Sequence, residues 1–229
     1  MSANTPDLTR RAYARTNLQT IGQRAALLRA LVPNVRSIAE LCCGDCRPQA
    51  ALYRRALGIT SFRGLELVPA IVTMNRQHGV DCVLGDALDP AVLGQFLAFE
   101  VTFFGPPLSA GCDGHSILAF NAVTPPFAAF AQLFLAALRY QGLLVCIAPN
   151  TTTMGDVRRL YQQVRAGRPD VGLAAIHYSY ATVTGLGQST AARLKYVELW
   201  FSPVLGDQWQ VWNSGQQVQI APERIDHEA

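Results

Sequence analysis

The chain has 229 residues, of which half are apolar and 15% are charged, and its formal net charge is +3. This length supports one domain with small appendages, and no apolar run reaches the roughly 18 residues that a membrane span needs. The first 17 residues carry charges without an apolar stretch behind them, which argues against a secretory signal. We therefore expect a cytoplasmic protein whose six cysteines are reduced.

Positive charge is concentrated in the first third of the chain. Residues 1–80 contain eleven arginines and four acids, whereas the remainder holds more acids than bases. Two interpretations stay open for this excess. It forms either ordinary solvated helix faces or a surface for an anionic partner such as RNA or DNA.

The elements follow a regular order along the chain. Residues 5–32 are helix-permissive and amphipathic until Pro33 interrupts the pattern, which predicts one or two leading helices. Helical stretches then alternate with the apolar runs "RSIAEL", "SFRGLEL", "DCVLGD", "EVTFFG" and "GLLVCIAP". Strands and helices that alternate at this pitch predict a parallel sheet covered by helices on both faces.

The pattern changes near the C-terminus. Two β-rich runs, "AIHYSYATVTG" and "ARLKYVELWFS", have no helix between them and predict an antiparallel hairpin. The stretch "QWQVWNSGQQVQI" predicts a smaller hairpin that turns at "NSG". We expect a doubly wound, Rossmann-like α/β fold with a seven-stranded, mostly parallel sheet and an antiparallel terminal hairpin.

The stretch "ELCCGDC", residues 40–46, follows the first predicted strand and places three cysteines around Gly44. A glycine turn at the carboxyl end of such a strand lets backbone N–H groups approach a ligand closely. The loop lacks the G-x-G-x-x-G pattern, which disfavours a nucleotide-dependent oxidoreductase. A zinc site commonly uses two pairs of ligands, and no second C-x-x-C occurs, so a metal is the weaker alternative.

Two further acids stand at predicted strand ends. Glu66 ends the second strand, 22 residues beyond Gly44, where a carboxylate can accept hydrogen bonds from both ribose hydroxyls of a nucleoside cofactor. Asp86 ends the third strand and is placed to accept a hydrogen bond from an adenine amine. Each acid alone is equally compatible with a helix cap or a surface charge.

Together, "ELCCGDC", "GLELVPAIVTMNRQHG" and "GDALD" resemble the first three motifs of the class I S-adenosylmethionine (SAM)-dependent methyltransferases. The resemblance covers roughly residues 36–202 and implies SAM as the cofactor. It implies that Glu40 organises the turn and faces the methionine amino group, while the neighbouring cysteines are small packing residues. The cofactor-binding positions that it implies are Glu40, Cys42, Gly44, Glu66, Leu67, Asp86 and Ala87.

The resemblance also divides the chain into three expected parts. These are an N-terminal helical extension over residues 1–33, a SAM-binding methyltransferase domain over residues 34–203, and a C-terminal hairpin and tail over residues 204–229. No metal is implied, because the sulfonium group of SAM is already an activated methyl donor.

The fourth predicted strand ends in "GPPL", where amino methyltransferases of the family carry Asp or Asn, two prolines and an aromatic residue. The implied catalytic positions are Gly105, Pro106, Pro107 and Leu108. Gly105 offers only its carbonyl to orient an amine, and Leu108 lacks the ring that stacks on a planar group. A rigid exit turn after a buried strand is the alternative interpretation.

A glycine-rich segment follows with Cys112, Asp113 and His115, which suits either a mobile lid or a turn with a buried thiol. The resemblance implies a methyltransferase, and the "GPP" turn and the basic first third favour a nitrogen of RNA or DNA as its acceptor. The alternatives are a protein amide or a small molecule as acceptor, and a methyltransferase-like binding protein without turnover.

Overall fold

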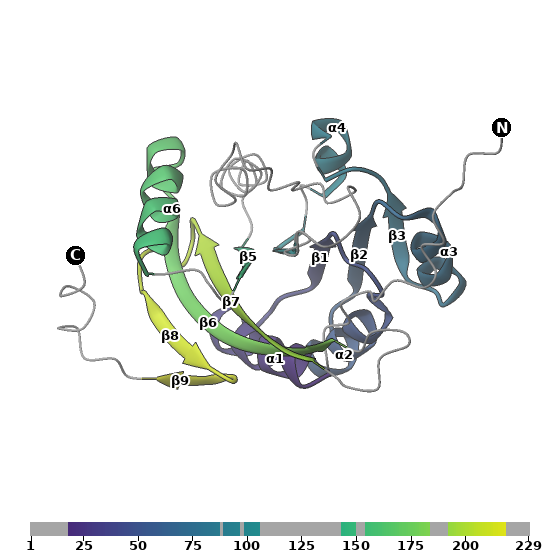
Figure 1. The fold of residues 1–229 in the computed structure, drawn as a ribbon, viewed down its shortest axis with the longest axis horizontal. Helices are drawn as coiled ribbons and strands as arrows, with labels where there is room; N and C mark the ends of the chain where they lie inside the picture. The colour runs from purple at the N-terminus through teal and green to yellow at the C-terminus, as the bar shows by residue number, and fades with distance from the viewer. Residues whose placement is uncertain are drawn as a thin grey trace.

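One sheet of nine strands runs through the described part of the chain (Figure 1). The computed structural model describes residues 18–87, 89–96, 99–105, 143–149, 154–183 and 192–218. Its strands are β1 (Ser37–Leu41), β2 (Ser61–Glu66), β3 (Asp81–Leu84), β4 (Val101–Phe104), β5 (Leu143–Pro149), β6 (Gly172–Val183), β7 (Ala192–Ser202), β8 (Gln210–Asn213) and β9 (Gln216–Val218). Its helices are α1 (Leu18–Leu31), α2 (Arg47–Leu57), α3 (Pro69–Gln77), α4 (Pro90–Leu93), the 3₁₀ helix η2 (Gly94–Phe96) and α6 (Met154–Gly167).

The strand order is β3-β2-β1-β4-β5-β7-β6-β8-β9. Strands β1 to β5 are mutually parallel, and β7 runs antiparallel to both of its neighbours, β5 and β6. The parallel sheet with an antiparallel hairpin is therefore confirmed. Because parallel strands share one carboxyl edge, the chain segments that leave β1, β2, β3 and β4 meet along the same side of the sheet.

The predicted number of seven strands is wrong. Strand β8 pairs in parallel with β6, and β9 pairs with β8, so the small C-terminal hairpin extends the same sheet. The hairpin is held in place by Leu173 of β6, whose carbonyl accepts hydrogen bonds from the N–H groups of Gln208 and Trp209. A strand edge offers unpaired backbone groups, and β8 satisfies those of β6.

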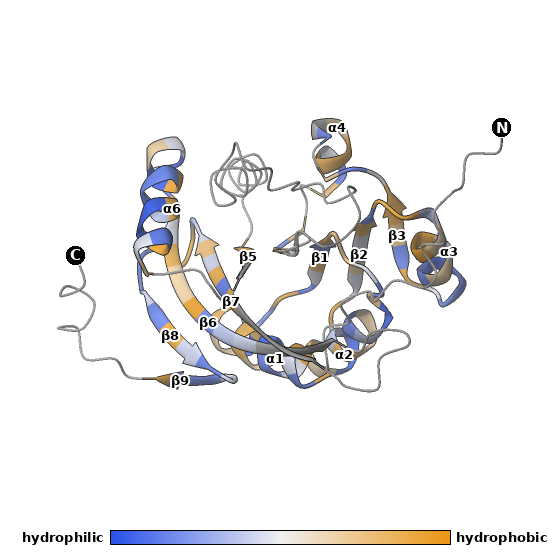
Figure 2. Ribbon diagram, viewed as in Figure 1, coloured by the Kyte–Doolittle hydropathy of each residue, from blue (hydrophilic) through white to orange (hydrophobic). Residues whose placement is uncertain are grey.

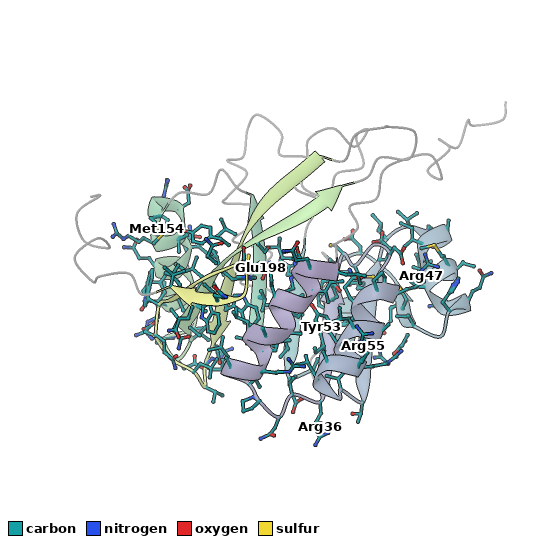
Figure 3. The ribbon with its side chains drawn as sticks, turned by 90° about the horizontal axis from the view of Figure 1, so that it is seen from below. Arg36, Arg47, Tyr53, Arg55, Met154 and Glu198 are labelled. Atoms are coloured by element: carbon teal, nitrogen blue, oxygen red, sulfur yellow. The ribbon has the colours of Figure 1, made fainter. Side chains whose placement is uncertain are left out.

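Helices cover both faces of the sheet, as the alternating pattern predicted. One apolar cluster includes Leu28 of α1, Tyr53 of α2 and Val72 of α3. The cluster on the opposite face includes Leu93 of α4 and Leu160 of α6. Figure 3, seen from below, shows α1 and α2 lying across the first of these two faces.

The helices follow from their local sequences. Helix α6 buries Val157, Leu160 and Val164 at helical spacing and exposes polar positions between them (Figure 2). Helix α2 ends at Leu57 and is capped by Gly58, whose φ of 68° lets its N–H group bond to the carbonyl of Arg54. Among the described residues, no helix combines the length and apolar character needed to cross a membrane.

Candidate cofactor site

The loop after β1 turns sharply at two left-handed residues. Cys42 has a φ of 57° and Gly44 has a φ of 56°. Between them, the N–H group of Cys43 donates a 2.9 Å hydrogen bond to the carbonyl of Leu65 in β2. Glycine adopts this region freely, whereas a side chain at Cys42 costs roughly 1 kcal/mol or more. The surrounding contacts must therefore hold Cys42 in the left-handed conformation, whereas Gly44 adopts it without steric strain.

The Glu66 carboxylate ties this loop to the end of β2. Its Oε2 accepts a 2.9 Å hydrogen bond from the N–H group of Gly44. Its Oε1 accepts from the N–H groups of Leu67 and Val68, at 2.9 and 3.0 Å. Burial raises the pKa of Glu66, although these three donors act to lower it. Of about four acceptor positions on a carboxylate, three are in use.

Glu66 and Asp86 both lie near the thiol of Cys42. Burial raises the pKa of Cys42 to about 12, and the negative charges of Glu66 and Asp86 add to the shift. Of the two residues that follow these acids, Leu67 is 42% exposed and Ala87 is buried. The structure therefore brings Cys42, Gly44, Glu66 and Asp86 together at one edge of the sheet.

Glu40 is directed elsewhere. It is buried on β1, and its Oε1 lies 3.9 Å from Nη1 of Arg24 on helix α1. Burial raises the pKa of Glu40 to about 7, although Arg24 and a hydrogen bond with Gln49 lower it. The carboxylate of Glu40 thus faces the α1 side of the sheet, while Glu66 meets the loop.

A buried polar network that the sequence patterns did not predict extends from Arg24. Glu198 of β7 accepts hydrogen bonds from Nε of Arg24 at 2.7 Å and from Oγ of Ser179 at 3.0 Å. Nδ1 of His177 lies 2.8 Å from Oε2 of Glu198. Although burial alone raises it, the charges of Arg24 and His177 bring the pKa of Glu198 down to about 2. The guanidinium of Arg24 also lies over the ring of Phe103, 5.1 Å from its centroid.

Three buried thiols form a further cluster. The sulfur atoms of Cys43, Cys46 and Cys82 all lie within 4.8 Å of one another. From the sequence a metal was the weaker alternative, because Cys82 supplies no second C-x-x-C pair. Hydrogen bonds from the thiols of Cys43 and Cys46 lower the pKa of Cys82, against the effect of burial.

Gly105 is the one predicted catalytic position that the structure describes. Its N–H group donates a 3.2 Å hydrogen bond to the carbonyl of Leu41, so β4 ends beside the start of the loop. A Cβ atom at this position would lie 3.1 Å from Cδ1 of Ile147. The other predicted positions of this region, Pro106, Pro107, Leu108, Cys112, Asp113 and His115, lie outside the described residues.

The chain matches no protein-family model and no curated protein sequence. Its fold is similar to that of a candidate RNA methyltransferase from Pyrococcus horikoshii, with a TM-score of 0.55, 12% identity, and coverage of 88% of this chain and 92% of that one. Thermoplasma acidophilum protein 1320 gives a TM-score of 0.53 at 14% identity, over 86% and 91% of the two chains.

The methyltransferase subunit of a type I restriction-modification system from Streptococcus thermophilus is also similar. Its TM-score is 0.52 at 14% identity, and the match covers 94% of this chain and 52% of that chain. At these identities the similarity concerns the fold. The chain thus shares the fold of methyltransferases, in agreement with the resemblance of its first three motifs.

Proposed function

We propose that the protein is a SAM-dependent methyltransferase whose cofactor site is the carboxyl edge of β1, β2 and β3. The observation that carries the proposal is the convergence of Glu66 and Asp86 on the turn formed by Cys42 and Gly44. A nucleoside cofactor presents hydroxyl and amine donors, and carboxylates beside a close-approach turn are the acceptors that such donors need. The methyl group would come from SAM itself.

The residues present fit the nucleoside part of SAM. Among the described residues, Oε2 of Glu66 accepts one hydrogen bond, from Gly44, so it retains capacity for one ribose hydroxyl. A second hydroxyl would have to replace the N–H group of Gly44. We assign the adenine amine to Asp86 and apolar contact with the base to Leu67 and Ala87. The exposed side chain of Leu67 is available for such contact.

Glu40 has a positioning role in this proposal. Its carboxylate is buried and interacts with Arg24 and Gln49, so it joins β1 to helices α1 and α2 directly below the turn. Removing it would displace the residues that precede Cys42. A contact between Glu40 and the methionine amino group is part of the family resemblance, and the contacts with Arg24 and Gln49 support only the organising part of that role.

The proposed acceptor is a nitrogen on RNA or DNA. Two of the structurally similar proteins are named for nucleic-acid systems, and the first third of this chain carries the excess of arginine. In the first third of the chain, the exposed arginines among the described residues are Arg29, Arg36, Arg54, Arg55 and Arg76. They lie in the last turns of α1, α2 and α3 and in the segment before β1, toward the amino end of the sheet. Figure 3 labels Arg36 and Arg55 of this set. A nucleic acid would therefore have to extend along these helices to reach the opposite edge.

Gly105 limits how the acceptor can be held. It has no side chain to accept a hydrogen bond, and the methyl group of Ile147 occupies the space beside it. Its carbonyl could still orient an amine, since methyl transfer from a sulfonium depends mainly on positioning. The same feature favours the second candidate, a protein that binds SAM without turnover.

Isothermal titration calorimetry with SAM and with NAD tests the cofactor assignment. We expect SAM to bind and Glu66→Ala and Asp86→Ala to weaken its affinity at least tenfold. Asp81→Ala is the matched control, because this exposed acid begins the strand that precedes Asp86. Binding of NAD alone, or SAM affinity that is equal in all four proteins, would refute the assignment.

Tritium-methyl transfer from SAM then distinguishes the acceptors. Purified protein would be incubated with total RNA, genomic DNA or denatured protein from one cell extract. We expect label in nucleic acid. Label in protein would support the amide alternative, and SAM binding with no labelled product in any fraction or in small molecules would support the binding protein.

A further inference from the structure

The three thiols of the cluster meet in the apolar core below the proposed cofactor loop. Cys43, Cys46 and Cys82 are 5%, 0% and 1% exposed. The sulfur atoms of Cys43 and Cys82 are 3.9 Å apart, and all three sulfur atoms lie within 4.8 Å of one another. Two thiolates bound to one tetrahedral Zn²⁺ at about 2.3 Å would lie about 3.8 Å apart. The observed spacing needs little change to close around one ion.

The fold assembles this cluster from two distant segments. Cys43 and Cys46 form a C-x-x-C pair at the start of α2, and Cys82 comes from β3, two strands away from β1 in the sheet. Gly64 of β2 lies between them, and a Cβ atom there would be 2.7 Å from the sulfur of Cys43 and 3.0 Å from that of Cys46. The absence of a side chain at Gly64 is what allows the sulfur atoms to converge.

Polar groups surround the cluster in the manner of a metal site. Nδ2 of Asn75 lies 3.6 Å from the sulfur of Cys82 and donates a 2.9 Å hydrogen bond to the carbonyl of Gly44. Nε of Arg76 donates to the carbonyl of Cys82 at 2.7 Å. Three thiolates around a divalent ion leave one net negative charge, which the guanidinium of Arg76 is placed to offset. Hydrogen bonds to ligating atoms and nearby compensating charge are what metal ligands require.

The fourth coordination position is not supplied by sulfur. No fourth His, Cys, Asp or Glu joins the cluster within the described segments. Asn75 is fully buried, and its Oδ1 has no hydrogen-bond partner among the described residues. The side-chain amide of Asn75 contacts the sulfur of Cys82. It would therefore lie next to an ion bound by the cluster.

We propose that Cys43, Cys46 and Cys82 bind one divalent thiophilic ion of the Zn²⁺ class as thiolates. Binding replaces the thiol protons, which pass to solvent, and forms three sulfur–metal bonds without any change of oxidation state. The ion would join the loop after β1, the start of α2 and strand β3. Its role is structural, because the sulfur atoms face the core cluster of α1 to α3, whereas Cys42 packs against the opposite cluster.

Metal analysis of the full-length protein, purified with a phosphine reductant and without chelators, tests the site. After growth with added zinc, we expect elemental mass spectrometry to find about one equivalent of Zn²⁺ per chain. Replacement by Co²⁺ should give the intense thiolate-to-cobalt absorption of a site with three sulfur ligands. Cys43→Ala and Cys82→Ala should each lose both signals, with Cys82→Ser as the variant to use if Cys82→Ala does not fold.

Cys146→Ala is the matched control. Cys146 is a buried free cysteine in β5, within the opposite apolar cluster, and its loss should leave metal content and the cobalt spectrum unchanged. Adding Zn²⁺ to the metal-free protein should raise Tm by about 5 °C in the wild type and in Cys146→Ala alone. All of these readouts are independent of SAM, so they separate failure of this site from failure of the proposed function.

Two results would overturn the proposal. One is a folded wild-type protein that takes up neither Zn²⁺ nor Co²⁺, or a Cys82 variant that binds as much metal as the wild type. The other is a disulfide between Cys43 and Cys82, found by mass spectrometry of peptides from protein purified without reductant, in a sample that binds no metal after reduction. That outcome would assign the cluster to thiol redox chemistry instead.

Discussion

The backbone N–H group of Gly44 donates a hydrogen bond of 2.9 Å to Oε2 of Glu66. This contact joins the loop after β1 to the carboxyl end of β2, and it occupies the oxygen that we assign to a ribose hydroxyl. Cofactor binding and loop geometry are therefore coupled through one carboxylate. A change at Glu66 should affect both the loop and the affinity for SAM.

Replacement of Glu66 should separate these two effects. Glu66→Ala removes the acceptor of three backbone N–H groups and should reduce the free energy of unfolding by about 1–3 kcal/mol. Glu66→Gln keeps one carbonyl oxygen but not the negative charge, so it should be closer to wild type in stability while binding SAM at least tenfold more weakly.

Urea denaturation and calorimetry measure the two quantities on the same samples. Asp81→Asn is the control for loss of an exposed carboxylate, and it should change neither. Equal SAM affinity in Glu66→Gln and wild type would contradict the assignment of the ribose to Glu66.

Glu40 should make the protein less stable as the pH rises. Burial raises its pKa in the folded state to about 7, from 4.5 in the unfolded chain. Between these values the folded state holds a proton that the unfolded state has lost, so the free energy of unfolding falls with increasing pH. The contribution is fully present below pH 4.5 and is lost as the pH passes about 7.

Glu40→Gln removes this titration. Compared with wild type, the variant should gain about 2–3 kcal/mol of stability between roughly pH 5 and pH 8. Chemical denaturation at a series of pH values gives the comparison directly. Parallel profiles for the two proteins would show that Glu40 is ionised throughout this range in the folded state.

Burial should decide the importance of two ion pairs with the same separation. Arg24 and Glu198 are 2.7 Å apart with side chains 2% and 0% exposed, whereas Arg63 and Asp81 are 2.7 Å apart with side chains 34% and 52% exposed. Glu198→Ala leaves the buried guanidinium of Arg24 without its close partner and should cost about 3–5 kcal/mol.

Asp81→Ala serves as the exposed counterpart and should cost less than about 1 kcal/mol. Denaturant midpoints of the two variants, measured under one set of conditions, provide the test. The double variant Arg24→Met with Glu198→Met should recover part of the loss, because the buried guanidinium is removed together with its close partner. Similar costs for Glu198→Ala and Asp81→Ala would contradict the buried network.

Local sequence patterns were sufficient to predict most of the fold. The alternation of apolar runs with helical stretches identified the parallel strands, and the two β-rich runs identified β6 and β7, because periodicity and turn residues act over a few positions. The pairing of β8 with β6 was not predicted, because it uses backbone groups at the edge of β6 and needs no particular side-chain pattern.

The buried clusters were missed for a related reason. Arg24 and Glu198 are 174 positions apart, and Cys82 follows Cys43 by 39 positions. Neither separation corresponds to a turn of helix or a strand pairing within one motif. A signal was present only indirectly, in charged residues placed among apolar ones: Arg24 lies between Ile21 and Leu28 on the apolar face of its helix. The site acids at strand ends could be proposed because sheet topology brings such positions to one edge.

Gly64 should tolerate no larger residue without a loss of stability. In Gly64→Ala, the new methyl group would lie 2.7 Å from the sulfur of Cys43, in a region that is closed by Cys46. Either the thiols separate or β2 moves, so we expect a loss of about 1–3 kcal/mol in the free energy of unfolding. Bound Zn²⁺ should be lost with it, since the three sulfur atoms could no longer converge.

Gly22→Ala is the matched control for this substitution. A Cβ atom at Gly22 meets no atom within 4 Å, and alanine in the middle of helix α1 should stabilise the protein by about 0.5–1 kcal/mol. If the packing is as described, urea denaturation should show a lower free energy of unfolding for Gly64→Ala and a higher one for Gly22→Ala than for the wild type. Zinc content is measured in parallel. A Gly64→Ala protein with wild-type stability and one bound Zn²⁺ would show that the sulfur atoms approach one another without the space that Gly64 provides.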